Sequence, residues 1–316
     1  MIAEVPPEDW NGVLEELGHV DVYLTREYVE ASALLEPGRP LFLRSDEAVF
    51  AAILRGDPPD VTTPYGYGGP VGPGFWDEYE AWCRDHGVVT TFVRFHPLYA
   101  NHRDLPTSVH VEPLAPTVAW RLDGGDDLLE RMHRHHRRVA RKALAAGVET
   151  HAELAPESLE RFRALYEQTM ERQDAVGFYF FPEDYWHALE TSLRDHVVLF
   201  EAGDDAQLLC LHAPPWLHYH LGASSEAGRK LGASTLLFLE AARWAQGLGY
   251  TRFHLGGGVG GKRDSLHEFK LRFDPGGELE MAVGKAIHDP EAYRGLAGHD
   301  AGFEGFFPAY RATVQA

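Results

Sequence analysis

The feature that most constrains the fold is the stretch from Tyr219 to Ala245, "YHLGASSEAGRKLGASTLLFLEAARWA". Its beginning is strand-like, its middle is rich in small residues, and its end is a strongly apolar helical sequence. A strand that leads through a turn into a buried helix is typical of an α/β protein. The backbone N–H groups at such a helix N-terminus favour an anion such as pyrophosphate. A plain strand-to-helix turn accounts for the same residues, and this sequence alone leaves both readings open.

The same kind of element order occurs twice along the chain. Strands are expected at 40–45, 48–55 and 88–95, and a helix at 75–87, before the proline-punctuated stretch 111–116. The pattern then restarts with a strand at 117–122, a long helix over 126–146 and further alternating elements. A length of 316 residues suits two domains. We therefore predict an α/β (α+β) fold with domains at 1–115 and 116–285, each a mixed central sheet flanked by helices.

Charge is distributed unevenly. The chain has 48 Asp and Glu against 29 Lys and Arg, a net charge of −19, which argues against general coating of nucleic acid. Residues 131–142 nevertheless carry six Arg and Lys and no acid. This segment suggests a local anion site that includes Arg134 and Arg138, although a solvated basic helix face would have the same composition. The neighbouring histidines lack the spacing of a metal site, and no metal is expected.

Several classes of protein are disfavoured by what the chain lacks. The first residues show no signal-peptide pattern, and no apolar run approaches the roughly 18 residues of a membrane helix. Its two cysteines, Cys83 and Cys210, are far apart, which suits a reducing compartment, and we expect a cytoplasmic protein. The motifs of serine hydrolases, P-loop enzymes, zinc proteases and dinucleotide-binding domains are absent.

Three short motifs could carry chemistry. The opening turn contains Arg229, Lys230, Gly232 and Ser234, in the spacing Arg-x-x-Gly-x-small, next to a helix start. Lys270 lies on a helix face that is otherwise apolar, with Leu266, Phe269 and Phe273. Such a lysine either extends its ammonium to solvent or directs it at charge developing on a reacting carbonyl. Tyr65 and Tyr67, on the glycine-rich loop "TPYGYGGP", suit substrate contacts or a structural turn equally.

With these residues considered together, the chain resembles the Fem-type (FemABX-like) transferases, which are tandem GNAT-fold proteins. The resemblance is strongest from about 117 to 274. It rests on the order of "TVAWRL", "LLERMHRHHRRVARKALAAGV", "LYEQTMERQ", "HYHLGASS", "FHLGGG" and "FKLRF". The resemblance implies two GNAT-like domains, and it allows residues 286–316 to return to the first.

The resemblance also implies a function and roles for residues. It implies an N-acyltransferase that forms an amide bond, with Phe269 and Lys270 at the donor's reacting end and Tyr219 and Arg172 near the acceptor. The donor implied is an aminoacyl-tRNA, as in the peptidoglycan enzymes, or an acyl-CoA, as in other GNAT proteins. The acceptor would be a small-molecule or peptide amine, and no tightly bound cofactor is expected. A non-catalytic binding protein on the same scaffold is a third reading.

This chain departs from the peptidoglycan enzymes at two points. It lacks their early lysine after an aromatic residue, since "REYVEASALLE" offers none. It also has no room for the long helical-hairpin arm of some members. Both departures argue against a cell-wall acceptor. The spacing from Arg229 to Ser234 is close to a GNAT pyrophosphate loop, with Ser where Gly or Ala is usual.

Overall fold

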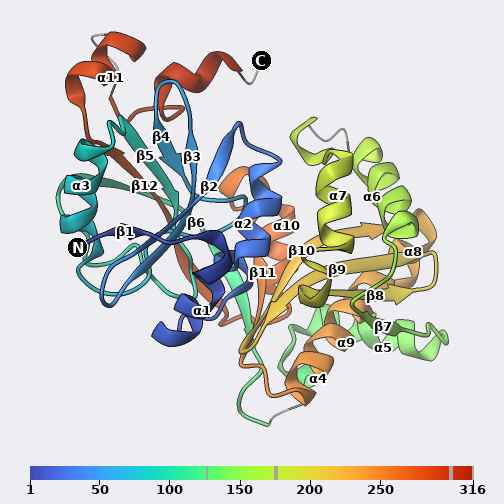
Figure 1. The fold of residues 1–316 in the computed structure, drawn as a ribbon. Coiled ribbons are helices and arrows are strands. Elements are labelled where there is room, and N and C mark those ends of the chain that lie inside the picture. Colours follow the sequence, from blue (N-terminus) through green and yellow to red (C-terminus); the bar gives the residue numbers. More distant parts are fainter. Residues whose placement is uncertain (126, 174–176, 299–301, 315–316) are drawn as a thin grey trace. The chain divides into compact units, whose positions relative to one another are not determined.

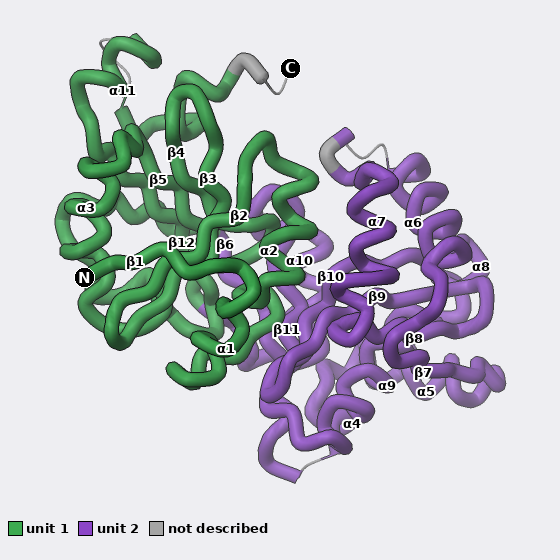
Figure 2. Tube along the Cα trace, in the orientation of Figure 1, with its two compact units in different colours: residues 1–114, 280–316 green, residues 115–279 purple. Residues whose placement is uncertain are grey.

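The structure is a computed structural model that describes residues 1–125, 127–173, 177–298 and 302–314. It divides into two compact units (Figure 2). Unit 1 comprises residues 1–114 and 280–316, and unit 2 comprises residues 115–279. The end of the chain is thus part of the same unit as its beginning. Among the described residues, no helix is both long and apolar enough to cross a membrane.

Unit 1 is a mixed sheet with helices on both faces (Figure 1). Its strands run in the order β1-β2-β3-β4-β5-β12, with β4 and β5 parallel and the other neighbours antiparallel. The strands are β1 (Ala3–Glu4), β2 (Gly38–Arg44), β3 (Val49–Arg55), β4 (Asp60–Thr62), β5 (Thr90–Arg94) and β12 (Glu278–Ile287). The helices are α1 (Pro7–Leu17), η1 (Val22–Leu24), α2 (Arg26–Ala33), α3 (Phe75–Asp85), α11 (Pro290–Ala297) and η5 (Ala309–Val314).

The central strands of unit 1 are apolar on both faces because each face has its own core. Along β3, Phe50 and Ala52 pack with helix α3, whereas Ala51 and Ile53 pack with α1 and α2. This alternation follows from the two-residue period of a strand. It explains why "AVFAAILR" is a continuous apolar run rather than an alternating one.

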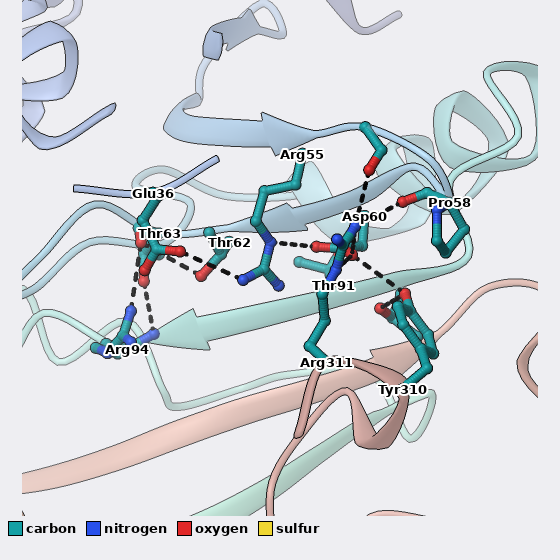
Figure 3. Close-up of polar contacts among 12 residues, drawn as sticks. Glu36, Arg55, Pro58, Asp60, Thr62, Thr63, Thr91, Arg94, Tyr310 and Arg311 are labelled. Atoms are coloured by element: carbon teal, nitrogen blue, oxygen red, sulfur yellow. Dashed lines mark hydrogen bonds and ion pairs between the residues drawn. The ribbon is translucent and has the colours of Figure 1, made fainter. Parts of the chain in front are cut away.

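The C-terminal segment is fixed to unit 1 through a buried carboxylate (Figure 3). Asp60, on β4, is fully buried and accepts a hydrogen bond from Arg55 Nε on the neighbouring strand β3. Arg311 Nε donates to the other carboxylate oxygen of Asp60 at 2.8 Å, and the Tyr310 hydroxyl donates to the same atom at 3.3 Å. A buried carboxylate needs such partners, because leaving it unpaired in a low-dielectric interior is costly.

The strands of unit 2 are hydrogen-bonded in the order β6-β11-β10-β9-β8-β7. Only β10 and β11 run parallel. The strands are β6 (Val109–Arg121), β7 (His151–Leu154), β8 (Val197–Ala202), β9 (Ala206–Ala213), β10 (Trp216–Ser224) and β11 (Arg252–Gly256), β6 starting in unit 1. The helices are α4 (Leu128–Arg131), α5 (Arg134–Ala145), α6 (Glu160–Arg172), η2 (Gly177–Tyr179), α7 (Glu183–Glu190), η3 (Arg194–His196), α8 (Glu226–Leu231), α9 (Ala233–Gly247), η4 (Val259–Gly261) and α10 (Ser265–Leu271).

Helix α9 is the centre of the unit 2 core. It packs with α4 and α5 against one face of the sheet, while α6 and α7 cover the other (Figure 1). Most of α9 is buried, as the apolar sequence predicts. The strand, turn and helix expected at 219–245 are therefore present, with a short additional helix, α8, inside the turn.

The single long helix expected over 126–146 is wrong. The described part of this segment forms two helices, α4 and α5, separated by Met132 and His133 in extended conformations (residue 126 lies outside the described residues). The His133 N–H donates to the carbonyl oxygen of Arg272 at 2.9 Å instead of to a helical carbonyl. His133 then becomes the N-cap of α5, with its Nδ1 accepting from the N–H of His135. A tertiary hydrogen bond thus overrides a local helical pattern.

Candidate functional site

The candidate site begins where two parallel strands separate. β10 pairs with β11 over Trp216–His218, and both strands carry an irregularity directly afterwards, between Tyr219 and Leu221 and between His254 and Gly256. Bulges bend a strand and interrupt its ladder. Beyond His218, β10 remains paired with β9 on one side, but its pairing with β11 on the other side ends. A sheet that opens in this way leaves space beside β10 for a ligand.

A cavity of about 370 Å³ lies beside this part of β10. We call it the β10 cavity. Its wall includes residues of α5, α6, α9 and α10 as well as Tyr219, Gly222 and Ser224 of the strand. Five residues singled out from the sequence contribute to the wall: Tyr219, Arg229, Gly232, Ser234 and Phe269. The structure therefore brings together residues from three motifs that are separate in the sequence.

The turn before α9 has a specific backbone geometry. Gly232 ends α8 and begins α9 with a positive φ of 80°. A Cβ at this position would lie 2.4 Å from Cγ1 of Val139 on α5. Glycine is thus required both for the left-handed conformation and for the close packing of α5. The N-terminus of α9 has no side-chain cap, and Gly232 and Ser234 at this terminus are part of the wall of the β10 cavity.

Tyr219 lies over Gly222 in the wall of the cavity. A Cβ on residue 222 would be 2.5 Å from the Tyr219 hydroxyl oxygen, so only glycine leaves room for this ring position. The ring also packs against Phe238 of α9, with centroids 5.0 Å apart. The absence of a side chain at one strand position thus fixes the orientation of an aromatic side chain at another.

Lys270 is a buried lysine next to this ring. Its side chain comes from α10, which Asp264 caps by accepting from the N–H of His267. The Nζ atom donates to the carbonyl oxygen of Gly257 at 2.6 Å and lies 5.3 Å from the centroid of the Tyr219 ring. Only 5% of Lys270 is exposed. Burial lowers the pKa of Lys270 to about 7, against the opposing attraction of Asp264. Lys270 therefore does not extend to solvent.

The basic helix separates into paired and unpaired arginines. Arg137 and Arg141 both form ion pairs with Glu130, and Arg131 lies 3.5 Å from a carboxylate oxygen of Asp274. Arg134 and Arg138 form no ion pair with any residue that the structure describes, and both line a second cavity. The arginines of the basic segment 131–142 are thus two sets with different surroundings.

The remaining sequence candidates lie elsewhere. Lys230 is exposed, pairs with Glu226, and is not in the wall of the β10 cavity. Arg172 donates to the carbonyl oxygen of Ser224, at the end of β10. Tyr65 and Tyr67 belong to unit 1, where the Tyr28 hydroxyl donates to the carbonyl oxygen of Tyr65 and the Tyr67 ring packs against Tyr23.

Sequence reasoning missed three residues of these walls: His135, His136 and Arg272. Arg272 follows Lys270 by two residues. It lies beside the start of α5 because its carbonyl oxygen accepts from the N–H of His133, a contact that the sequence does not indicate. The spacing of these histidines argues only against a metal site. His136 is buried, with its Nε2 within 2.9 Å of the carbonyl oxygen of Phe269. Burial lowers its pKa to about 4, so the ring is neutral near pH 7.

Part of this chain matches a family of known proteins, and the whole chain shares its fold with solved structures. Residues 130–270 match a family described as an acetyltransferase (GNAT) domain. The chain also has the fold of FemX, with a TM-score of 0.65 at 14% identity over 95% of this chain and all of that one. No curated protein matches the chain.

Two further solved structures have the same fold. L-PGS from Bacillus licheniformis has a TM-score of 0.61 at 19% identity, over 90% of this chain and 93% of that one. The C-terminal domain of a putative lysylphosphatidylglycerol synthetase from Agrobacterium fabrum has a TM-score of 0.54 at 14% identity, over 91% and 93%. The predicted α/β fold with a mixed sheet flanked by helices is thus confirmed, and the GNAT match covers residues 130–270. Residues 130–270 match the acetyltransferase (GNAT) domain family, and the chain as a whole has the fold of FemX.

Proposed function

We propose that this protein forms an amide bond by moving an acyl group from an activated carrier to an amine in the β10 cavity. The observation that carries the proposal is the buried Lys270 ammonium beside Tyr219, a residue of the cavity wall. Burying a lysine costs free energy, and one that has no carboxylate within hydrogen-bonding distance among the described residues needs a further reason to be retained.

The reaction is a direct transfer. The neutral acceptor amine attacks the acyl carbonyl, a C–N bond forms, and the bond to the carrier's oxygen or sulfur breaks. The proton that the amine loses ends on the departing carrier atom. Lys270 in its protonated form stabilises the negative charge that develops on the carbonyl oxygen. Tyr219 and Phe269 hold the reacting groups in position, which lowers the barrier by reducing the entropy lost on reaching it.

We propose aminoacyl-tRNA as the acyl carrier. The shared fold with FemX, at a TM-score of 0.65, supports this carrier. A second structure of the same fold is named for an aminoacylated product, lysylphosphatidylglycerol. The unpaired Arg134 and Arg138 near the cavity supply positive charge for a nucleic-acid phosphate. The acceptor is a small-molecule or peptide amine, and we propose Arg172, which donates to Ser224 in the cavity wall, as a residue that contacts it.

Acyl-CoA is the second candidate carrier. It is favoured by Arg229, Gly232 and Ser234, which line the β10 cavity at the uncapped start of α9. A pyrophosphate at this turn would have backbone N–H groups and one arginine as partners. Lys230 is not part of this arrangement, since it pairs with Glu226.

One experiment separates these carriers. Purified protein is incubated with radiolabelled aminoacyl-tRNA or radiolabelled acetyl-CoA and a panel of amines, and the acid-stable, amide-linked product is measured. We expect product from aminoacyl-tRNA, its loss in Lys270→Met, and normal product in Lys230→Ala. Product from acetyl-CoA alone would replace the first carrier by the second. Retention of neither carrier, together with no product from any amine, would contradict acyl transfer itself.

A further inference from the structure

The second cavity of unit 2 has a purely basic lining. It has a volume of about 540 Å³ and is lined by His133, Arg134, His135, Arg138 and Arg272. We call it the arginine pocket. Its residues come from the N-cap and first turns of α5 and from the residue that follows α10. No acidic side chain is among the described residues that line it, although the chain as a whole has a net charge of −19.

On α5, the arginines outside this pocket are paired with acidic side chains, and those that line it have no such pair among the described residues. On the same helix, Arg137 and Arg141 are paired with Glu130. Within the described part of the chain, Arg134, Arg138 and Arg272 make no ion pair. Three unneutralised guanidinium groups held near one another repel, and an anion between them removes that repulsion. With 48 acidic residues available in the chain, the lack of a partner points to a ligand that supplies the charge.

The electrostatic effect of these charges is visible at His135. Its pKa is held below the ordinary value, first by burial and then by the positive charges of Arg272, Arg138 and His133. The potential in the pocket is therefore positive. The N-terminus of α5, a helix of 12 residues, adds its own partial positive charge at the same place.

The backbone fixes the pocket's geometry. The N–H of His133 bonds to the carbonyl oxygen of Arg272, which ties the start of α5 to the end of α10. The same link breaks the helix between α4 and α5 and so places Arg134 and Arg138 in the first turns of a new helix. The arginines thus converge because of a specific tertiary contact, which a solvated basic surface does not need.

The arginine pocket and the β10 cavity share His135 and Arg272 in their walls. A ligand that places its acyl end beside Tyr219 therefore has the arginine pocket within reach of its other end. We infer that the arginine pocket binds a phosphate group of the acyl carrier, so that the carrier is a phosphate-bearing nucleotide held at both cavities. This inference rests on the proposed acyl transfer in the β10 cavity. The phosphate belongs either to the 3′-terminal nucleotides of an RNA or to coenzyme A.

Binding measurements without an acceptor test the inference. The probes are adenosine 3′,5′-bisphosphate, adenosine, CoA, dephospho-CoA and an RNA minihelix with a tRNA acceptor arm. The variants are Arg138→Gln and Arg272→Gln, with Arg141→Gln as the matched control, because Arg141 lies on the same helix but is paired with Glu130. Circular dichroism and thermal melting establish that each variant is folded.

We expect Arg138→Gln and Arg272→Gln to weaken the phosphate-bearing probe by about 10-fold, and Arg141→Gln to change it less than about twofold. The slope of log affinity against log salt should fall by about 1 for each lost phosphate contact. If the variants lose affinity for the minihelix alone, the phosphate belongs to RNA. If they lose affinity for CoA and the bisphosphate alone, it belongs to the coenzyme. Equal affinities of all three variants for every probe would overturn the inference.

Phosphate binding in the arginine pocket and the proposed acyl transfer can each be disproved without the other. If arginine variants lose phosphate binding but the wild-type protein transfers no acyl group, the pocket stands and acyl transfer fails. If the wild type transfers acyl groups and both arginine variants keep its KM for the donor, acyl transfer stands and the pocket is wrong.

Discussion

The Nζ atom of Lys270 lies 5.3 Å from the centroid of the Tyr219 ring, whose hydroxyl sits directly over Gly222. The ammonium is thus held between a carbonyl oxygen, that of Gly257, and an aromatic face. An aromatic face stabilises a cation by about 0.5–2 kcal/mol. This is less than the cost of burial, since the pKa of Lys270 remains lowered to about 7. The site therefore holds a lysine that changes its charge near neutral pH.

The first prediction concerns the rate as a function of pH. Protonated Lys270 stabilises the oxyanion, and its fraction falls as the pH rises through about 7. With both substrates saturating, kcat should decline above about pH 7 because Lys270 loses its positive charge. Lys270→Arg keeps its charge at all these pH values and should lose the decline, while Lys270→Met should lower kcat by about 100-fold or more. A descending limb that persists unchanged in Lys270→Arg would assign it to another group.

The second prediction concerns stability as a function of pH. The pKa of Lys270 is about 7 when folded against a model value of 10.5, so between these values the unfolded chain binds more protons and stability rises with pH. Below about pH 7 the cost of the charged lysine is fully present. Replacing Lys270 by Met removes this dependence. The stability difference between mutant and wild type should thus shift in favour of the mutant by on the order of 3 kcal/mol from pH 10 to pH 6.

Denaturant unfolding at the two pH values measures this difference. The loss of the hydrogen bond to Gly257 destabilises Lys270→Met equally at both pH values, so it cancels when the two stability differences are compared. Lys230→Met serves as the control, because Lys230 is exposed and its ammonium pairs with Glu226 at the surface. A parallel pH dependence of wild type and Lys270→Met would show that the lysine is not desolvated in the folded protein.

The third prediction concerns the glycine beneath Tyr219. In Gly222→Ala the new methyl would lie 2.5 Å from the Tyr219 hydroxyl oxygen, so the ring must move within the cavity wall. We expect a loss of about 10-fold or more in kcat/KM with a stability change of about 1–2 kcal/mol. Tyr219→Phe removes the hydroxyl oxygen, and in the double variant with Gly222→Ala it should restore part of the activity. A double variant no more active than Gly222→Ala would contradict this explanation.

The fourth prediction concerns the carboxylate that fixes the C-terminal segment. Asp60→Asn leaves Arg55 and Arg311 without their shared charged partner, and we expect unit 1 to lose about 3–5 kcal/mol of stability. Arg39→Ala, which removes an exposed pair with Glu4, should cost less than about 1 kcal/mol. Denaturant unfolding followed by tryptophan fluorescence compares the two. Equal, small effects would mean that the buried network contributes little.

The sequence by itself determined much of the local structure. Short apolar runs bounded by turn residues predicted the strands, the apolar stretch after Gly232 predicted α9, and the apolar face with Lys270 predicted α10. These patterns are predictable because they depend on residues close in the chain, whose side chains share one face of a helix or strand. The turn at Arg229 and Gly232 was located for the same reason.

The tertiary structure alone decided which charges are available to a ligand. Arg131 and Arg141 pair with Asp274 and Glu130, whereas Arg134 and Arg138 form no ion pair with any residue in the described ranges. The break between α4 and α5 was likewise set by the carbonyl oxygen of Arg272, which lies far along the chain. Ion pairing and hydrogen bonding act over a few ångströms in space, so no distance along the sequence can reveal them. Residue type fixed the charge of each arginine, and the fold fixed which of them meets an acidic side chain.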